Sequence, residues 1–252
     1  YANKDNEPAD YSPDNVPYKP KHHLPISLKG VEKGDFAMVL GYPGGTDRYM
    51  TSMEIDALIN ITNANRINVR GIRQEILLED MLADDAIRIK YASKYSSSAN
   101  YWKNSIGMNK ALKQLKIIEK KKVNETEFTT WVNSNKKLSE KYGDALSLIE
   151  KAVNERAEIK NARQYLYETM KRSMEIFDIA YDATDLYLAL TSESKGLQNE
   201  IDDFKKIATK FYKDYSSPTD QKVVPVMFEI YAKNIDSKFY PDVYNEIENK
   251  YN

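Results

Sequence analysis

The stretch Gly34–Thr51, GDFAMVLGYPGGTDRYMT, marks the point at which the sequence pattern of the chain changes. Its apolar run Phe36–Leu40 is short and lies between two glycines, which is typical of a strand covered on both faces. After Thr51 the apolar residues recur every three or four positions, which is the spacing of helices. We therefore expect this stretch to join a small β segment to a large helical region.

The expected strand ends in a turn with the sequence Gly41-Tyr42-Pro43-Gly44-Gly45. Proline presets one turn dihedral, and the glycines tolerate a positive φ. Two interpretations stay open. The amides of such a turn can approach an anion or an oxyanion closely, and the same residues also suit a purely structural turn. No Walker lysine follows, and the spacing differs from a dinucleotide fingerprint.

The segment before this stretch is polar and interrupted by prolines, which disfavour helix. The alternating residues Leu24–Leu28 suit a short strand, and Pro25 places it at a sheet edge. Two or three strands are only marginally stable in isolation. We therefore expect the partner strands to be supplied by polypeptide outside this chain.

From Ser52 onward the periodicity predicts helices of unequal length, so the predicted fold class is mainly α, an irregular multi-helix bundle with the small N-terminal β segment. The expected features are a short helix capped by Thr51 or Ser52, a break at Ser96–Ser98, a helix over Asn100–Lys122, a capping box at Asn124-x-x-Glu127, and one long helix from Asp144 towards Leu190.

Composition narrows the classes of function. The 252 residues carry 37 basic and 38 acidic side chains, so no global field attracts nucleic acid or an anionic membrane. Cysteine is absent, which excludes disulfides, thiolate metal sites and cysteine catalysis. The only histidines, His22 and His23, lie in the proline-rich segment without neighbouring carboxylates. We expect no metal site and no cofactor.

Asn100 and Asn104 are the candidate binding residues. They lie four positions apart, so both fall on one helix face, and an amide carbonyl can accept a hydrogen bond from an ammonium group. Gly107 in the same helix costs about 1 kcal/mol, which suggests close packing or a nearby ligand. A capping role of Asn100, at the start of a helix at Tyr101, is an equally open interpretation.

Three parts of the chain resemble the serine dipeptidyl-peptidases of the dipeptidyl-peptidase 7 and 11 type, which are exported enzymes of Gram-negative bacteria. They are PYKPKHHLPISLKGVEKGDFAMVLGYPGGTDRYMTS at 17–52, IRIKYASKYSSSANYWKNSIGMNKAL at 87–112, and the tyrosine-rich helices that follow. The resemblance implies a chymotrypsin-like double β-barrel with an inserted helical cap over the active-site cleft. Residues 1–51 would belong to the barrel and 52–252 to the cap.

The resemblance also implies an activity, the removal of dipeptides from peptide N-termini by acyl transfer. The catalytic histidine and aspartate would precede Tyr1, and the serine would follow Asn252, so this chain holds no catalytic residue and is expected to be inactive alone. An asparagine of the helical domain holds the substrate amine in the family; the best match is Asn100, with Asn104 as the alternative. Where family members often read Gly-Arg-Thr, this chain reads Gly-Gly-Thr.

Other functions stay open at this point. A helical protein-interaction module without enzymatic activity is the main alternative. Lysines interleave with Tyr91, Tyr95 and Tyr101 as in a single-strand nucleic-acid binder, although an amphipathic helix pair also explains them. The expected partner is a peptide substrate in the full-length parent, with a homodimer through an exposed strand edge left open. The expected location is periplasmic or exported.

Overall fold

The computed structural model describes residues 1–42, 44–192 and 196–251. Contacts between Cα atoms divide the chain into two compact units, residues 1–46 and 47–252. The division lies close to the expected boundary between Thr51 and Ser52. The assignment of the two parts to a barrel and a cap stays a prediction.

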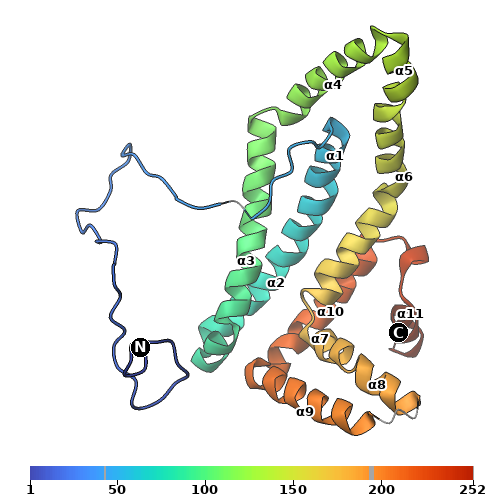
Figure 1. The fold of residues 1–252 in the computed structure, drawn as a ribbon. Coiled ribbons are helices and arrows are strands. Elements are labelled where there is room, and N and C mark those ends of the chain that lie inside the picture. Colours follow the sequence, from blue (N-terminus) through green and yellow to red (C-terminus); the bar gives the residue numbers. More distant parts are fainter. Residues whose placement is uncertain (43, 193–195, 252) are drawn as a thin grey trace. The chain divides into compact units, whose positions relative to one another are not determined.

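Helices and short connections make up the second unit from Ser52 onward, as far as the structure describes it (Figure 1). Its elements, in which η1 and η2 are π-helices and η3 is a 3₁₀-helix, are α1 Ser52–Ala57, η1 Leu58–Asn63, α2 Ala64–Ala83, α3 Asp85–Gln114, α4 Ile117–Asn133, α5 Lys136–Tyr142, α6 Ala145–Leu166, η2 Tyr167–Lys171, α7 Glu175–Asp182, α8 Thr184–Thr191, α9 Leu197–Asp214, α10 Ser217–Asn234, η3 Ser237–Phe239 and α11 Asp242–Tyr251. The mainly helical fold class is thus confirmed. None of these helices combines the length and apolar character needed to cross a membrane.

The first unit contains no strand among its described residues, so the strands expected at Leu24–Leu28 and Phe36–Leu40 do not form here. One isolated antiparallel bridge joins Ala2 to Val16. A strand needs a neighbour for its backbone hydrogen bonds, and this unit supplies none to the apolar run. Phe36 is 88% exposed and Val39 95%. Of the predicted glycine turn, Pro43 lies outside the described residues.

Helix α1 begins as its sequence predicts. The Thr51 hydroxyl accepts from the Glu54 amide, and the Glu54 carboxylate accepts from the Thr51 amide at 2.8 Å, which completes a capping box. The next residue, Ser52, donates from its amide and its hydroxyl to the Glu125 carboxylate of α4. The start of the helical unit is therefore fixed both locally and across to α4.

Helix α2 lies at the centre of the helical unit, in contact with α3, α6, η2 and α10, and Figure 1 shows α3 returning alongside it. The largest fully buried apolar side chains belong to this core: Leu77, Tyr91, Met174, Met227 and Tyr231. Each large side chain that leaves water in this way stabilises the fold by about 1.5–3 kcal/mol. The core therefore joins elements that are distant in the sequence.

The break expected at Ser96–Ser98 is wrong, because α3 runs without interruption through these residues. Ser98 and Ala99 are buried, and such small side chains allow two helices to approach closely. Packing along α2 therefore overrides the weak local helix preference of serine. Asn100 consequently lies within the helix rather than at its start, which excludes the capping role.

Three further local predictions are wrong. The helix expected over Asn100–Lys122 is interrupted, because α3 ends at Gln114 and α4 begins at Ile117. The single helix expected from Asp144 towards Leu190 is divided, because η2 ends at Lys171 and α7 begins only at Glu175. Asn124 does not cap a helix, since α4 already begins after Lys116. Lys116 adopts a left-handed backbone conformation with φ 50°, and this residue turns the chain between α3 and α4.

Glycine positions in the helix pair α2 and α3 differ in what surrounds them. A β-carbon at Gly71 would lie 3.3 Å from the indole nitrogen of Trp102, which itself donates to the Ile67 carbonyl at 3.1 Å. A β-carbon at Gly107 would meet no described atom within 4 Å. The close packing expected at Gly107 is therefore not found in this chain.

We predict that Gly107→Ala raises the free energy of unfolding of this chain by about 1 kcal/mol, because alanine restricts the unfolded chain and favours helix. Gly71→Ala is the matched control. It should raise the free energy of unfolding less, or lower it, because the indole of Trp102 must shift. Urea unfolding followed by circular dichroism measures both. Equal gains at the two positions would contradict this account of α2 and α3.

Asp80 on α2 links this helix to α10. Its side chain is buried and accepts a hydrogen bond from the Lys222 ammonium. Burial opposes ionisation of Asp80, yet the hydrogen bonds from Lys222 and Thr219 lower its pKa below the ordinary value. A carboxyl group with a lowered pKa stabilises the fold above its unfolded pKa, and this contribution disappears as the pH falls through the folded value.

We therefore predict that Asp80→Asn destabilises the chain at pH 7 and that the difference from wild type narrows below about pH 4, the ordinary range of an aspartate. Thermal unfolding recorded from pH 3 to pH 7 measures this difference. A difference that stays constant across the range would show that the charge of Asp80 is not responsible.

Candidate functional site

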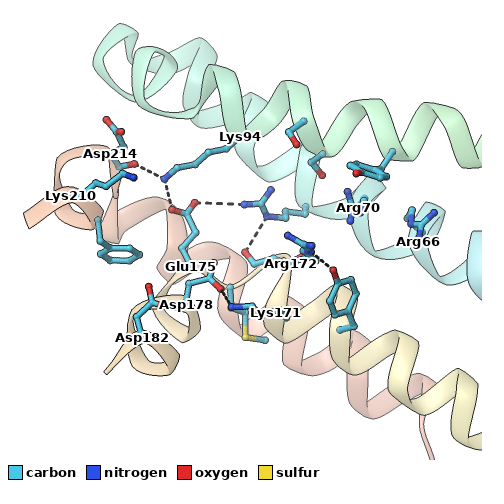
Figure 2. Close-up of a pocket in the computed structure, with 18 of the residues that line it drawn as sticks. Arg66, Arg70, Lys94, Lys171, Arg172, Glu175, Asp178, Asp182, Lys210 and Asp214 are labelled. Atoms are coloured by element: carbon cyan, nitrogen blue, oxygen red, sulfur yellow. Dashed lines mark hydrogen bonds and ion pairs between the residues drawn. The ribbon is translucent and has the colours of Figure 1, made fainter. Parts of the chain in front are cut away.

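A cleft of ≈ 750 Å³ opens within the helical unit, between α2, α3, η2, α7 and α9 (Figure 2). Charged side chains dominate its wall. The basic ones are Arg66, Arg70, Arg73, Lys94, Lys171, Arg172 and Lys210, and the acidic ones are Glu175, Asp178, Asp182 and Asp214. Its size is in the usual range for small-molecule and peptide sites.

A buried carboxylate lies behind this wall. Glu168 is 0% exposed, and its two oxygens accept from Arg66 Nε at 3.2 Å and from Arg70 Nε at 2.7 Å. The side-chain amide of Gln164 donates to the same carboxylate at 3.1 Å. A charge so deeply buried is stable only when it is paired and hydrogen-bonded, and here each oxygen has an arginine partner.

The local backbone explains why Glu168 points this way. Residues Tyr167–Lys171 form the wide π turn η2, an element often found at functional positions. The hydroxyl of Ser173 donates to the Glu168 carbonyl at 2.7 Å and closes the end of this turn. On the opposite side, Arg66 and Arg70 are four residues apart on α2 and therefore lie on one face.

A second charged group lies at the end of the cleft nearer α9. Glu175 accepts from Lys94 and lies 3.6 Å from Arg73, whose Nε donates to the Ser173 carbonyl at 3.1 Å. Burial lowers the pKa of Arg73 below its ordinary value, against the opposing field of Glu175. Burial, and to a lesser degree the negative charge of Glu175, raises the pKa of the neighbouring Tyr91.

Asp220 of α10 orients helix α7, which carries part of the cleft wall. Its carboxylate accepts from the backbone amides of Glu175 and Ile176, at 3.1 and 3.0 Å, so it caps α7 from another helix. The Tyr215 hydroxyl also donates to it, at 3.2 Å, and burial together with this carboxylate raises the pKa of Tyr215 to about 12.

The cations on the outer rim have different partners. Lys171 pairs with Asp178 at 2.7 Å, whereas Arg172 donates from Nε to the Tyr167 hydroxyl at 2.7 Å and has no carboxylate partner among the described residues. Lys210 likewise makes no ion pair within the part of the chain that the structure describes. Arg172 and Lys210 are thus cations of the cleft without an ion-pair partner among the described residues.

The predicted site residues lie outside this cleft. Asn100 and Asn104 are exposed on α3, whereas their neighbours Ser98 and Tyr101 line the cleft. His22 and His23 are exposed in the first unit. The role of the two asparagines in amine binding stays a prediction.

Sequence reasoning missed the arginine and glutamate residues of the cleft. A signal did exist on one side, because Arg66, Arg70 and Arg73 recur at helical spacing on one face of α2. Glu168 left no comparable signal. Its partners lie 98 and 102 residues away, and the π turn that directs it is not visible in an apolar periodicity.

A model of the family described as peptidase S46 matches residues 1–252. The chain belongs to the peptidase S46 family. It is 43% identical over 250 residues to dipeptidyl-peptidase 7 of Porphyromonas gingivalis, an alignment that covers 99% of this chain and 34% of that protein. It is 37% identical over 243 residues to the Asp/Glu-specific dipeptidyl-peptidase of the same organism, over 96% of this chain and 34% of the relative. The chain therefore spans about a third of the length of these S46 relatives.

Solved structures of the family agree. The crystal structure of Porphyromonas endodontalis DPP11 in complex with the dipeptide Arg-Asp matches with a TM-score of 0.71 at 31% identity, over 100% of this chain and 36% of that one. The complex of the same protein with Arg-Glu matches with a TM-score of 0.68 at 32% identity, over 99% of this chain and 36% of that one. The matched residues of this chain thus include both of its units.

We predict that Glu168→Gln lowers the free energy of unfolding by about 3–5 kcal/mol, because it leaves two arginines without their buried counter-charge. Glu158→Gln on α6 is the control. The Glu158 carboxylate forms an exposed ion pair with Lys238, which should add little to the free energy of unfolding. Urea unfolding of both variants measures the difference. Similar losses would show that the buried ion pairs do not hold α2 against η2.

Proposed function

We propose that this chain is the helical cap region, with part of the barrel, of an exported serine dipeptidyl-peptidase that removes dipeptides from peptide N-termini. The observation that carries the proposal is the 43% identity to dipeptidyl-peptidase 7 over nearly the whole chain. A non-enzymatic interaction module is not favoured, because other relatives with high coverage are also named dipeptidyl-peptidases.

The catalytic histidine, aspartate and serine of this proposal lie in polypeptide outside the chain. The unpaired apolar run 36–40 supports this reading of the first unit, because Phe36, Val39 and Leu40 are more than four-fifths exposed. An exposed apolar run of this kind calls for a covering partner, which a β-barrel would supply. In this proposal the run becomes a barrel strand only when the rest of the peptidase is present.

The substrate-binding part of the proposal concerns the peptide amine. Asn100, with Asn104 as the alternative, would accept a hydrogen bond from the substrate ammonium through its side-chain carbonyl. Both side chains are exposed on α3, and neither makes a hydrogen bond within the described chain, so both are available to a ligand. Two of the related structures are complexes of DPP11 with dipeptides, which favours a peptide partner here.

The proposal includes a periplasmic or exported location, and pairing with a second copy remains an open part of it. An unpaired apolar segment suits such pairing as well as it suits a barrel. Fractionation of cells that produce the longer protein tests the location, and analytical ultracentrifugation tests the association.

The decisive experiment compares this chain with the longer protein that contains it, on dipeptidyl chromogenic substrates. Hydrolysis by the longer protein and none by residues 1–252 is the expected result. Hydrolysis by the chain itself would show that it contains a complete catalytic site, and inactivity of both proteins would favour the interaction module.

In the longer protein, Asn100→Ala should lower kcat/KM by about 5- to 150-fold, because a contact to the substrate ammonium is lost. Asn124→Ala is the matched control, since Asn124 is an exposed asparagine on a different helix, α4. Steady-state kinetics of both variants, with Asn104→Ala alongside, measures the effect. An unchanged kcat/KM removes Asn100 from the site, and a loss confined to Asn104→Ala assigns the role to the alternative.

A further inference from the structure

Arg70 lines the cleft with a side chain that is 9% exposed. Its Nε is used on Glu168, and its Nη groups donate no hydrogen bond within residues 1–42, 44–192 and 196–251. Among the same residues, no buried side-chain nitrogen lacks a partner. Because Arg70 lines the cleft, the Nη groups of its guanidinium are donors at the cleft wall that the described fold leaves unused. The group is also held in place, since its central carbon lies 5.0 Å from the centroid of the Tyr101 ring.

Arg172 repeats this arrangement on the opposite wall. Its Nε donates to the Tyr167 hydroxyl, and its guanidinium carbon lies 5.0 Å from the centroid of that ring. Stacking and the Nε hydrogen bond fix the plane of the guanidinium, so the edge formed by its two Nη groups stays free for a ligand. Figure 2 shows Arg66, Arg70 and Arg172 at the same end of the cleft.

The charges of the cleft favour a carboxylate over a polyanion. The cleft has seven basic side chains, compared with five acidic ones when Glu168 is counted with the four in the lining. This is an excess of two positive charges in a chain whose net charge is −1. The other end of the cleft carries Asp182 and Asp214, neither of which has an ion-pair partner among the described residues. These carboxylates repel extended polyanions and suit the ammonium group of a peptide.

We propose that this cleft binds a short peptide through a carboxylate, which the Nη edges of Arg70 and Arg172 hold by paired hydrogen bonds. Planar guanidinium groups match carboxylates in this two-point geometry. The carboxylate is either the C-terminus of the peptide or an acidic side chain, because both have the same shape and charge. The site goes beyond the proposed function and is independent of where the catalytic residues lie.

Calorimetric titration of the 252-residue chain tests this proposal with three unlabelled peptides. Ala-Ala-Glu-Ala amide has only a side-chain carboxylate, Ala-Ala-Gln-Ala acid has only a terminal one, and Ala-Ala-Gln-Ala amide has neither. We expect either or both of the first two to bind, more weakly at high salt, and the third to bind at least tenfold more weakly. The stronger of the first two identifies the source of the carboxylate. Equal binding of all three would overturn the proposal, as would preferential binding of tripolyphosphate.

Variants on the rim separate the site from general charge. Arg172→Gln should weaken binding of the preferred peptide by about tenfold or more, because a charged hydrogen-bonding edge is lost. Arg172→Lys keeps the charge without the planar edge and should restore only part of the affinity. Arg156→Gln, an exposed charge on α6 outside the cleft, should bind as wild type does. Wild-type affinity in Arg172→Gln, or an equal loss in Arg156→Gln, would refute the assignment. Circular dichroism of each variant verifies the fold.

Discussion

The helical unit depends on one buried carboxylate. Glu168 is fully removed from water, and a charge in that position requires cations and hydrogen-bond donors around it. Arg66 and Arg70 supply the cations, which ties the register of α2 to the π turn of η2. Because removing either side leaves uncompensated charge, the constraint acts on both elements together.

The shape of the cleft follows from this constraint. The same turn that directs Glu168 inward ends the long helical run and lets α7 leave in a new direction, with Asp220 capping its first amides. Arg70 and Arg172 use Nε for a hydrogen bond within the protein, to Glu168 and to the Tyr167 hydroxyl, and both residues line the cleft. In the proposed peptide site, structural pairing and ligand recognition would use different faces of the same guanidinium groups, since a guanidinium carries five donors and the fold occupies only some of them.

The N-terminal unit contains an apolar run, residues 36–40, whose large side chains are exposed. An apolar run without neighbours cannot pair its backbone in a sheet or bury its side chains, whatever its own propensity. In the proposed peptidase, polypeptide outside this chain would complete the run as a strand, which suits a chain that spans about a third of its relatives. The helical unit differs in this respect, because its core joins α2, α6 and α10 from within the chain.

The sequence by itself determined the helical class and the family, and it narrowed the cap of α1 to Thr51 or Ser52, since these rest on periodicity, long motifs or local hydrogen bonds. Tertiary structure alone decided that α3 continues through Ser98, because packing against α2 outweighs a propensity of a few tenths of a kcal/mol. It also decided the cleft. Glu168 and its arginines are about a hundred residues apart, and no local pattern records which charges will share a buried environment.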